Sequence, residues 1–154
     1  MSFMRLALCM PIVVAAGCIP THDYAGDYDM TYDVVMSPVG SVQPIVSAGQ
    51  SVVTVHHGLN TDYLVELRAP SCKLEASYIE ARDVQDWPYL EIAPQTCWYS
   101  ADADASTLPL SLSGTATYDR DSERFAIVLA GSYGDASGAD HRHGSATVEL
   151  TESY

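Results

Sequence analysis

Apolar and polar side chains alternate along most of the chain after residue 25, and this alternation predicts β-strands. Between residues 27 and 36 nearly every second side chain is Tyr, Met or Val, and those between them are mostly Asp or Thr. A strand directs successive side chains to opposite faces, so this stretch has one apolar and one polar face. A helix would mix the two sets around its circumference. We therefore predict a half-buried strand here.

Similar alternation recurs further along, between segments rich in Gly, Pro, Asp and Ser. The clearest alternating stretches are 51–56, 62–69, 72–78, 110–118, 125–133 and 146–150, and weaker extended pieces are 42–46, 89–92 and 96–99. The stretches 110–118 and 125–133 flank the charged segment Asp119–Glu123, which predicts a hairpin. The chain thus predicts about eight to ten strands and no helix.

Short connections between these strands favour antiparallel pairing, and the polar faces favour a sheet that is wet on one side. Such a sheet has to bury its apolar face and protect its edges, which a closed barrel or a two-layer sandwich achieves. Because the strands are long and mostly form consecutive hairpins, we predict an all-β antiparallel barrel, with a two-layer β-sandwich as the alternative.

The start of the chain has a different character. Leu6–Ala16 is an apolar run that is too short to span a bilayer, which takes about 20 residues, and it is typical of a signal peptide. It leads into Val14-Ala15-Ala16-Gly17-Cys18, which resembles the lipobox of bacterial lipoproteins. The resemblance implies that residues 1–17 are removed and that Cys18 carries a lipid. Ordinary cleavage after Gly17 is the alternative, and it would leave Cys18 as a free thiol.

The rest of the chain divides into a short tether at residues 18–25 and one β domain at residues 26–154, a length that supports one sizeable core. The opening Gly26-Asp27-Tyr28 resembles the first-strand signature of lipocalin-like (calycin) barrels. That resemblance implies a barrel that holds a small apolar ligand.

A second resemblance covers residues 71–133. Ser71-Cys72, Gln95-Thr96-Cys97 and Ser113-Gly114-Thr115-Ala116-Thr117 resemble segments of small uncharacterised bacterial lipoproteins. The resemblance implies an exported domain held by lipid to a bacterial membrane, the outer membrane if the cell is Gram-negative. It carries no assigned activity.

The charge of the chain is strongly negative. The whole chain has 7 Lys and Arg against 20 Asp and Glu, and removal of residues 1–17 takes Arg5, which leaves 6 basic residues and a formal charge of −14. An acidic surface argues against nucleic-acid binding, which needs Lys and Arg at the phosphates. We interpret the negative charge as one that keeps the domain soluble. The less favoured interpretation is that the charge binds a cationic partner or divalent ions.

The chain has four cysteines. Cys9 lies in the predicted signal peptide and Cys18 at the predicted lipid site, so Cys72 and Cys97 remain as an even pair in an exported domain. We therefore predict a disulfide between Cys72 and Cys97.

Tyrosines are the most distinctive group on the predicted inner faces. They are Tyr28, Tyr32, Tyr63, Tyr78, Tyr118 and Tyr133, in a chain with only two Phe and two Trp. One interpretation is an aromatic cavity with polar tips that suits a small amphipathic ligand. The other is an ordinary core whose hydroxyls reach water at the barrel ends.

Metal and catalytic signals are weak. His141 and His143 share a face and are weak candidate metal ligands, with His56 or His57 as a third, but we prefer the interpretation that the pair lies in a solvent-facing loop and that there is no metal site. Asp119, Asp121 and Glu123 lack the glycine and distant Glu of a calcium loop and suit a charged hairpin tip.

No catalytic motif is present, and no cofactor is implied. We predict a non-enzymatic membrane-anchored module that binds a small apolar ligand or a protein partner. The alternatives are a structural envelope lipoprotein without a cavity and, further behind, an enzyme with a non-local site.

Overall fold

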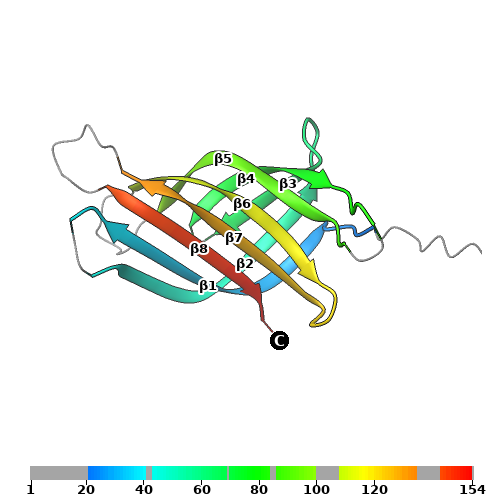
Figure 1. Ribbon diagram of the computed structural model, residues 1–154, viewed down its shortest axis with the longest axis horizontal. Coiled ribbons are helices and arrows are strands. Elements are labelled where there is room, and N and C mark those ends of the chain that lie inside the picture. The colour runs from blue at the N-terminus through cyan, green and yellow to red at the C-terminus, as the bar shows by residue number, and fades with distance from the viewer. Residues whose placement is uncertain are drawn as a thin grey trace, which may run out of the picture.

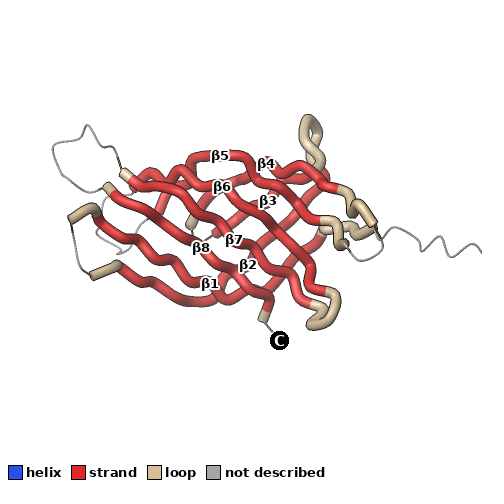
Figure 2. The backbone as a smooth tube through the Cα atoms, viewed as in Figure 1, coloured by secondary structure: helices blue, strands red, loops and turns tan. Residues whose placement is uncertain are grey.

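The computed structural model of the protein describes residues 21–40, 43–68, 70–83, 86–99, 108–134 and 143–153. The polypeptide within these ranges forms strands and loops, as Figure 2 shows. None of the described residues forms a helix long and apolar enough to cross a membrane.

Eight antiparallel strands form one closed barrel (Figure 1). The strands are β1 (Gly26–Pro38), β2 (Ile45–His57), β3 (Tyr63–Arg68), β4 (Ser71–Ile79), β5 (Tyr89–Tyr99), β6 (Leu108–Asp119), β7 (Arg124–Tyr133) and β8 (Gly144–Glu152). Each strand pairs with the next along the chain, and β8 pairs with β1 to close the ring. The predicted all-β antiparallel barrel is confirmed, and the chain does not form the alternative sandwich.

Two of the strands are longer than their sequence patterns predicted. The end of the piece at 42–46 and the whole piece at 51–56 belong to the single strand β2, which begins at Ile45, after Pro44. The pieces at 89–92 and 96–99 belong to β5, whose pairing with β6 shifts register between Ile92 and Gln95. Pro94 lies in this irregularity, where the missing N–H costs no ladder hydrogen bond.

The barrel interior is filled with apolar side chains. Val65, Leu90, Leu112 and Phe125 come from four different strands, and none of them has any accessible surface. An enclosed space wide enough for a water molecule would leave the side chains that line it partly accessible. The middle of the barrel is therefore a packed core, as the small diameter of an eight-stranded barrel allows.

Two glycines let neighbouring strands approach closely on the same wall. A Cβ on Gly131 of β7 would lie 1.8 Å from the carbonyl oxygen of Ser111, and one on Gly114 of β6 would lie 2.0 Å from that of Val128. Both contacts are with backbone atoms, which side-chain rotation cannot relieve. Only glycine fits at these two positions.

The two ends of the barrel differ in what they carry. The N-terminal end holds the start of β1 and the β2–β3, β4–β5 and β6–β7 connections, and the far end holds the other four connections. At the far end the predicted disulfide is present: Cys72 of β4 is bonded to Cys97 of β5, with the two Cα atoms 4.8 Å apart.

Candidate functional site at the N-terminal end of the barrel

Tyr24 is the residue that closes the N-terminal end of the barrel. Its side chain has no exposed surface, although it precedes the first strand. Its ring meets Tyr63 and Tyr78 edge to face, with centroids 6.1 and 6.4 Å apart, and lies 5.7 Å from the ring of Phe125. Its hydroxyl donates a hydrogen bond to the carbonyl oxygen of Pro88, in the connection before β5. Tyr24 thus joins both walls of the barrel at this end.

Neighbouring polar groups hold the segment around Tyr24 in place. The hydroxyl of Tyr28 donates to the carbonyl oxygen of Tyr24 at 2.8 Å. The hydroxyl of Tyr63 donates to the Asp23 carboxylate at 3.1 Å, and His57 Nε2 lies 3.3 Å from the same oxygen. The Tyr28 contact ties the segment to the start of β1, and the Tyr63 and His57 contacts link it to strands that lie far away in the sequence.

His22 also packs on the barrel, directly before Asp23. Its ring stacks on Tyr118 with a centroid distance of 4.4 Å and lies 6.1 Å from the ring of Trp87. Its backbone N–H donates to the hydroxyl of Tyr78 at 3.3 Å. The residues that the sequence assigned to a tether are therefore packed on the barrel from His22 onward.

The electrostatics of this end follow from burial and from these hydrogen bonds. Burial raises the pKa of Tyr28 to about 12, with the nearby Glu152 carboxylate as a second cause. Burial also raises the pKa of Tyr24 and lowers that of His22. The backbone N–H of Ala25 is the main cause that lowers the pKa of Asp23. At neutral pH the site thus contains neutral tyrosines and an ionised carboxylate.

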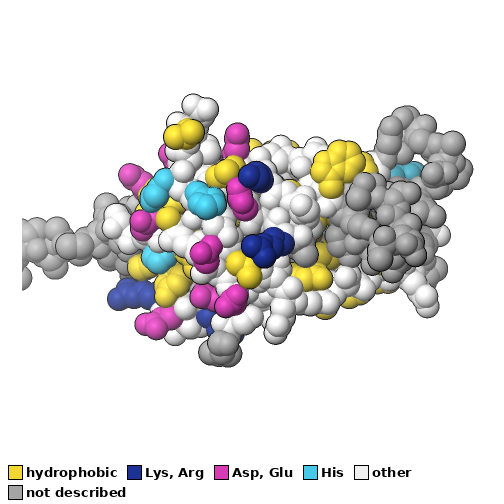
Figure 3. Space-filling model, turned by 180° about the vertical axis from the view of Figure 1, so that it is seen from behind, with side chains coloured by type: hydrophobic (Ala, Val, Ile, Leu, Met, Phe, Trp, Pro, Cys, Tyr) yellow, Lys and Arg dark blue, Asp and Glu magenta, His cyan; other side chains and the backbone are white. Residues whose placement is uncertain are grey.

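Acidic and histidine side chains crowd the surface at this end, as Figure 3 shows. His56, His57, Asp23 and Asp62 are all exposed there. Asp62 accepts a hydrogen bond from the backbone N–H of Tyr78 at 2.8 Å. The rim around the packed aromatic centre is therefore polar and mostly acidic.

The six predicted cavity tyrosines do not gather in one place. Four of them, Tyr28, Tyr63, Tyr78 and Tyr118, surround the segment that contains Tyr24. The other two stand apart: Tyr32 lies opposite Gly49 in the middle of β1, and Tyr133 lies at the far end of β7. Burial raises the pKa of Tyr133.

Sequence reasoning missed Tyr24, the residue at the centre of the cluster. It lies outside the alternating pattern, in a short segment that is bounded by Pro20 and Gly26. The one local signal was a large aromatic side chain in a segment that needs no apolar residue. Its position depends on contacts with Pro88 and Tyr63, which no local pattern contains.

The tyrosines at the N-terminal end are arranged to close the barrel, and their arrangement does not suit a catalytic site. The hydroxyls of Tyr24, Tyr28 and Tyr63 all donate to protein oxygens, so none of them points into open space. A general acid or base needs a free path to a bound substrate. The segment that contains Tyr24 therefore closes this end of the barrel, and the tyrosines of the strands hold it in place.

The structure does not bring the metal candidates together. Cys18 and His141 fall outside the described residues. His143 precedes β8 at the far end, where its carbonyl oxygen accepts a hydrogen bond from the N–H of Val39 at 3.0 Å, whereas His56 and His57 end β2 at the opposite end. No group of three potential metal ligands occurs within the described ranges.

The charged hairpin tip after β6 is arranged around Asp119. Its carboxylate accepts hydrogen bonds from the Ser122 hydroxyl at 2.7 Å and from the Asp121 N–H at 3.0 Å. The Ser122 hydroxyl is the main cause that lowers the pKa of Asp119. The carboxylate thus organises the turn.

Comparisons with protein families, with curated proteins and with solved structures return no match to this chain.

Proposed function

We propose that this protein is an exported bacterial lipoprotein, anchored through Cys18, whose barrel works as a non-enzymatic interaction module through its outer surface. The observation that carries the proposal is the packed interior, which Tyr24 closes at the N-terminal end. A carrier of small apolar ligands needs a cavity, which commonly has a volume of about 300 Å³ or more. The inner Leu, Val and Phe side chains leave no such space between the described strands.

The short link between the anchor and the barrel also supports the proposal. Only Ile19, Pro20 and Thr21 separate Cys18 from His22, which is packed on the barrel. Four residue steps span at most about 14 Å. A lipid on Cys18 would therefore hold the N-terminal end of the barrel against the membrane, and the far end would point away from it.

Mass spectrometry of the protein isolated from membranes tests the anchor. We expect residues 1–17 to be absent and Cys18 to carry diacylglycerol. The Cys18→Ser variant should leave the membrane fraction, whereas the matched Cys9→Ser variant should stay in it. An unmodified Cys18, or a chain that retains residues 1–17, would contradict the proposal.

The two tryptophans report the orientation, because they lie at opposite ends of the barrel. Trp87 packs beside His22, and Trp98 is 54% exposed near the end of β5. Each single Trp→Phe variant leaves the other tryptophan as the reporter. In vesicles that contain a headgroup-linked nitroxide quencher, the Trp98→Phe variant, which retains Trp87, should lose more fluorescence than the Trp87→Phe variant. Stronger quenching of Trp98 would reverse the proposed orientation.

The melting temperature in the presence of fatty acids and other small apolar compounds distinguishes an interaction module from a carrier of small ligands. A ligand that binds only the folded state raises the melting temperature, and the stabilisation grows with the logarithm of its concentration relative to Kd. We expect no shift for the protein in detergent. A saturable shift that disappears in the Val65→Phe variant would indicate an internal binding site and would overturn the packed-barrel proposal.

A further inference from the structure

Strand β2 has a long edge that no described strand covers. β2 has 13 residues but its neighbour β3 has only six. The pairing between them runs from Val53 opposite Leu67 to His57 opposite Tyr63. The residues from Ile45 to Val52 therefore pair with β1 on one side and with no described residue on the other. We call the segment Ile45–Val52 the open edge.

The hydrogen bonds of β1 show which backbone groups of the open edge are free. The carbonyl oxygen of Asp29 accepts from the N–H of Ser153 at 2.7 Å, so this residue directs its backbone groups away from β2. Alternate residues of an antiparallel strand point to alternate neighbours. Asp29 lies opposite Val52 in the β1–β2 register. The even-numbered residues Val46, Ala48, Gln50 and Val52 thus direct both N–H and C=O away from β1.

Among the described residues, the open edge lacks the features that usually protect an edge strand. Proteins block such edges with Lys, Pro, bulges or covering loops. The open edge contains no charged residue and no Pro, and its register with β1 has no bulge. Ile45 is 46% exposed and Val46 is 60% exposed. Within the described part of the chain, this is a row of hydrogen-bonding groups without a strand partner, flanked by accessible apolar side chains, which suits the addition of another strand.

Charges beside the open edge indicate the kind of strand that fits. Asp33 of β1 lies opposite Ala48, and Asp29 lies opposite Val52, and both carboxylates are exposed. Strands in a sheet are about 4.8 Å apart, and the short Ala48 side chain leaves room for a longer one to reach across it. A Lys or Arg on an added strand would approach Asp33. A second copy of this chain would instead bring more carboxylates.

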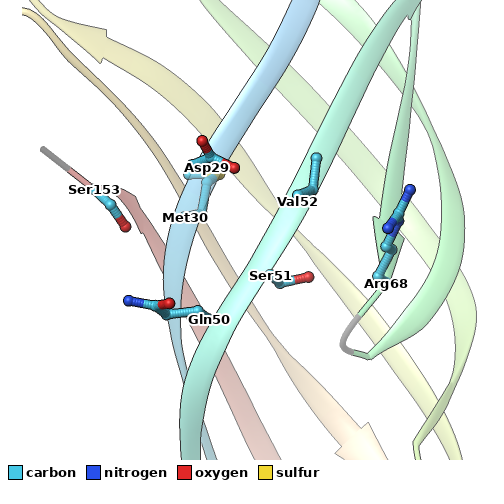
Figure 4. A pocket seen from close by; sticks show the side chains of 7 residues that line it. All are labelled: Asp29, Met30, Gln50, Ser51, Val52, Arg68 and Ser153. Atoms are coloured by element: carbon cyan, nitrogen blue, oxygen red, sulfur yellow. The ribbon is translucent and has the colours of Figure 1, made fainter.

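A surface hollow marks the place where β3 leaves β2 (Figure 4). The hollow has a volume of about 630 Å³ and is lined by Asp29, Met30, Gln50, Ser51, Val52, Arg68 and Ser153. The hydroxyl of Ser51 is buried there and makes no hydrogen bond to any described group. Arg68 ends β3 at this point, so the basic side chains of a partner would lie further along, toward Asp33.

We propose that the open edge binds an extended, positively charged segment of a partner protein, which adds a strand to the barrel beside β2. The inference deepens the proposed function, because it names the partner that the interaction module takes. It does not depend on the lipid at Cys18.

Binding is measured by fluorescence anisotropy with full-length protein in detergent micelles. The probe is a labelled short peptide of alternating Lys and Thr, and the control is the same peptide with Glu in place of Lys. We expect saturable binding of the Lys peptide and none of the Glu peptide. Asp33→Asn should weaken binding of the Lys peptide severalfold.

The Ala48→Pro variant tests the backbone contact. Proline removes an N–H that β1 does not use and places its ring on the open edge, so affinity should fall about tenfold. Ala48→Ser is the matched control, which retains the N–H and should bind as the natural protein does. If Ala48→Pro does not fold, Ala48→Lys replaces it, and its positive charge should repel the same peptide.

Absence of Lys-peptide binding would overturn the inference, and so would three further outcomes. They are equal binding by Ala48→Pro and Ala48→Ser, equal binding of the Lys and Glu peptides, and a dimer in sedimentation that Ala48→Pro dissolves, which would assign the edge to a second copy. Lipid on Cys18 with no peptide binding would overturn this inference alone. Unmodified Cys18 with peptide binding would overturn only the anchor.

Discussion

The hydroxyl of Tyr24 donates a hydrogen bond to the carbonyl oxygen of Pro88, and this contact joins two residues that are 64 positions apart. It connects the segment before β1 to the connection before β5, inside a cluster of aromatic rings. The segment from His22 to Ala25 is thus part of the folded barrel.

Removal of the Tyr24 side chain should strongly destabilise the barrel. Loss of a fully buried aromatic ring costs about 3–5 kcal/mol, so Tyr24→Ala should lower the free energy of unfolding in urea by that amount. Tyr24→Phe keeps the ring but leaves the Pro88 carbonyl oxygen without its donor, at a cost of about 1–2 kcal/mol. Leu59→Ala is the control, because Leu59 is fully exposed. A Tyr24→Ala effect as small as that of Leu59→Ala would contradict the closure.

The disulfide between Cys72 and Cys97 should contribute measurably to stability. It closes a loop with a sequence separation of 25. A disulfide across a loop of this length restricts the unfolded chain and thereby raises the free energy of unfolding by about 3 kcal/mol. The double variant Cys72→Ser, Cys97→Ser should unfold at correspondingly lower urea concentration. Addition of a reductant should lower the midpoint of the natural protein but leave that of the double variant unchanged. A midpoint that neither change affects would show that the bond adds no stability.

Gly131 should not tolerate a side chain. In Gly131→Ala the new Cβ would collide with the Ser111 carbonyl oxygen, so β6 and β7 have to move apart at a cost of about 1–3 kcal/mol. Gly26→Ala is the matched control, because a Cβ there meets nothing closer than 3.7 Å. Thermal unfolding of the two variants compares the positions directly. Equal melting temperatures would show that the strands are less closely packed than the structure indicates.

Mild acid should weaken the attachment of the N-terminal segment through His22. Burial lowers the pKa of His22 from its ordinary value of 6.5, so the unfolded chain takes up the proton first as the pH falls. This contribution to stability is therefore present at about pH 7.5 and declines as the pH falls below about 6.5.

His22→Phe retains an aromatic ring on Tyr118 but cannot be protonated. Its urea midpoint should change less between about pH 7.5 and 5.5 than that of the natural protein. The lowered pKa of Asp23 acts in a separate window, because that stabilisation is lost only as the pH falls below about 4. Parallel curves for the variant and the natural protein would contradict the role of His22.

Local patterns were sufficient for the strands and their faces. Tyr28, Met30 and Val34 lie on the inner side of β1, as the alternation predicted, because the side-chain period of a strand is fixed by its backbone. The same local reasoning divided β2 at the segment around Gly49 and divided β5 at Pro94. A segment that lacks good local residues still forms a strand when a neighbour pairs with it, and β1 pairs with β2 without a break through Gly49.

The sequence by itself determined the all-β class, the inner and outer faces, and the pairing of Cys72 with Cys97, because side-chain periodicity and cysteine count are properties of the chain alone. Tertiary structure alone decided the register with which β8 closes on β1, the insertion of Tyr24, and the open edge from Ile45 to Val52. Each of these depends on pairing register between distant segments. The open edge exists because β3 ends at Arg68 while β2 continues, and no pattern within either strand contains that difference in length.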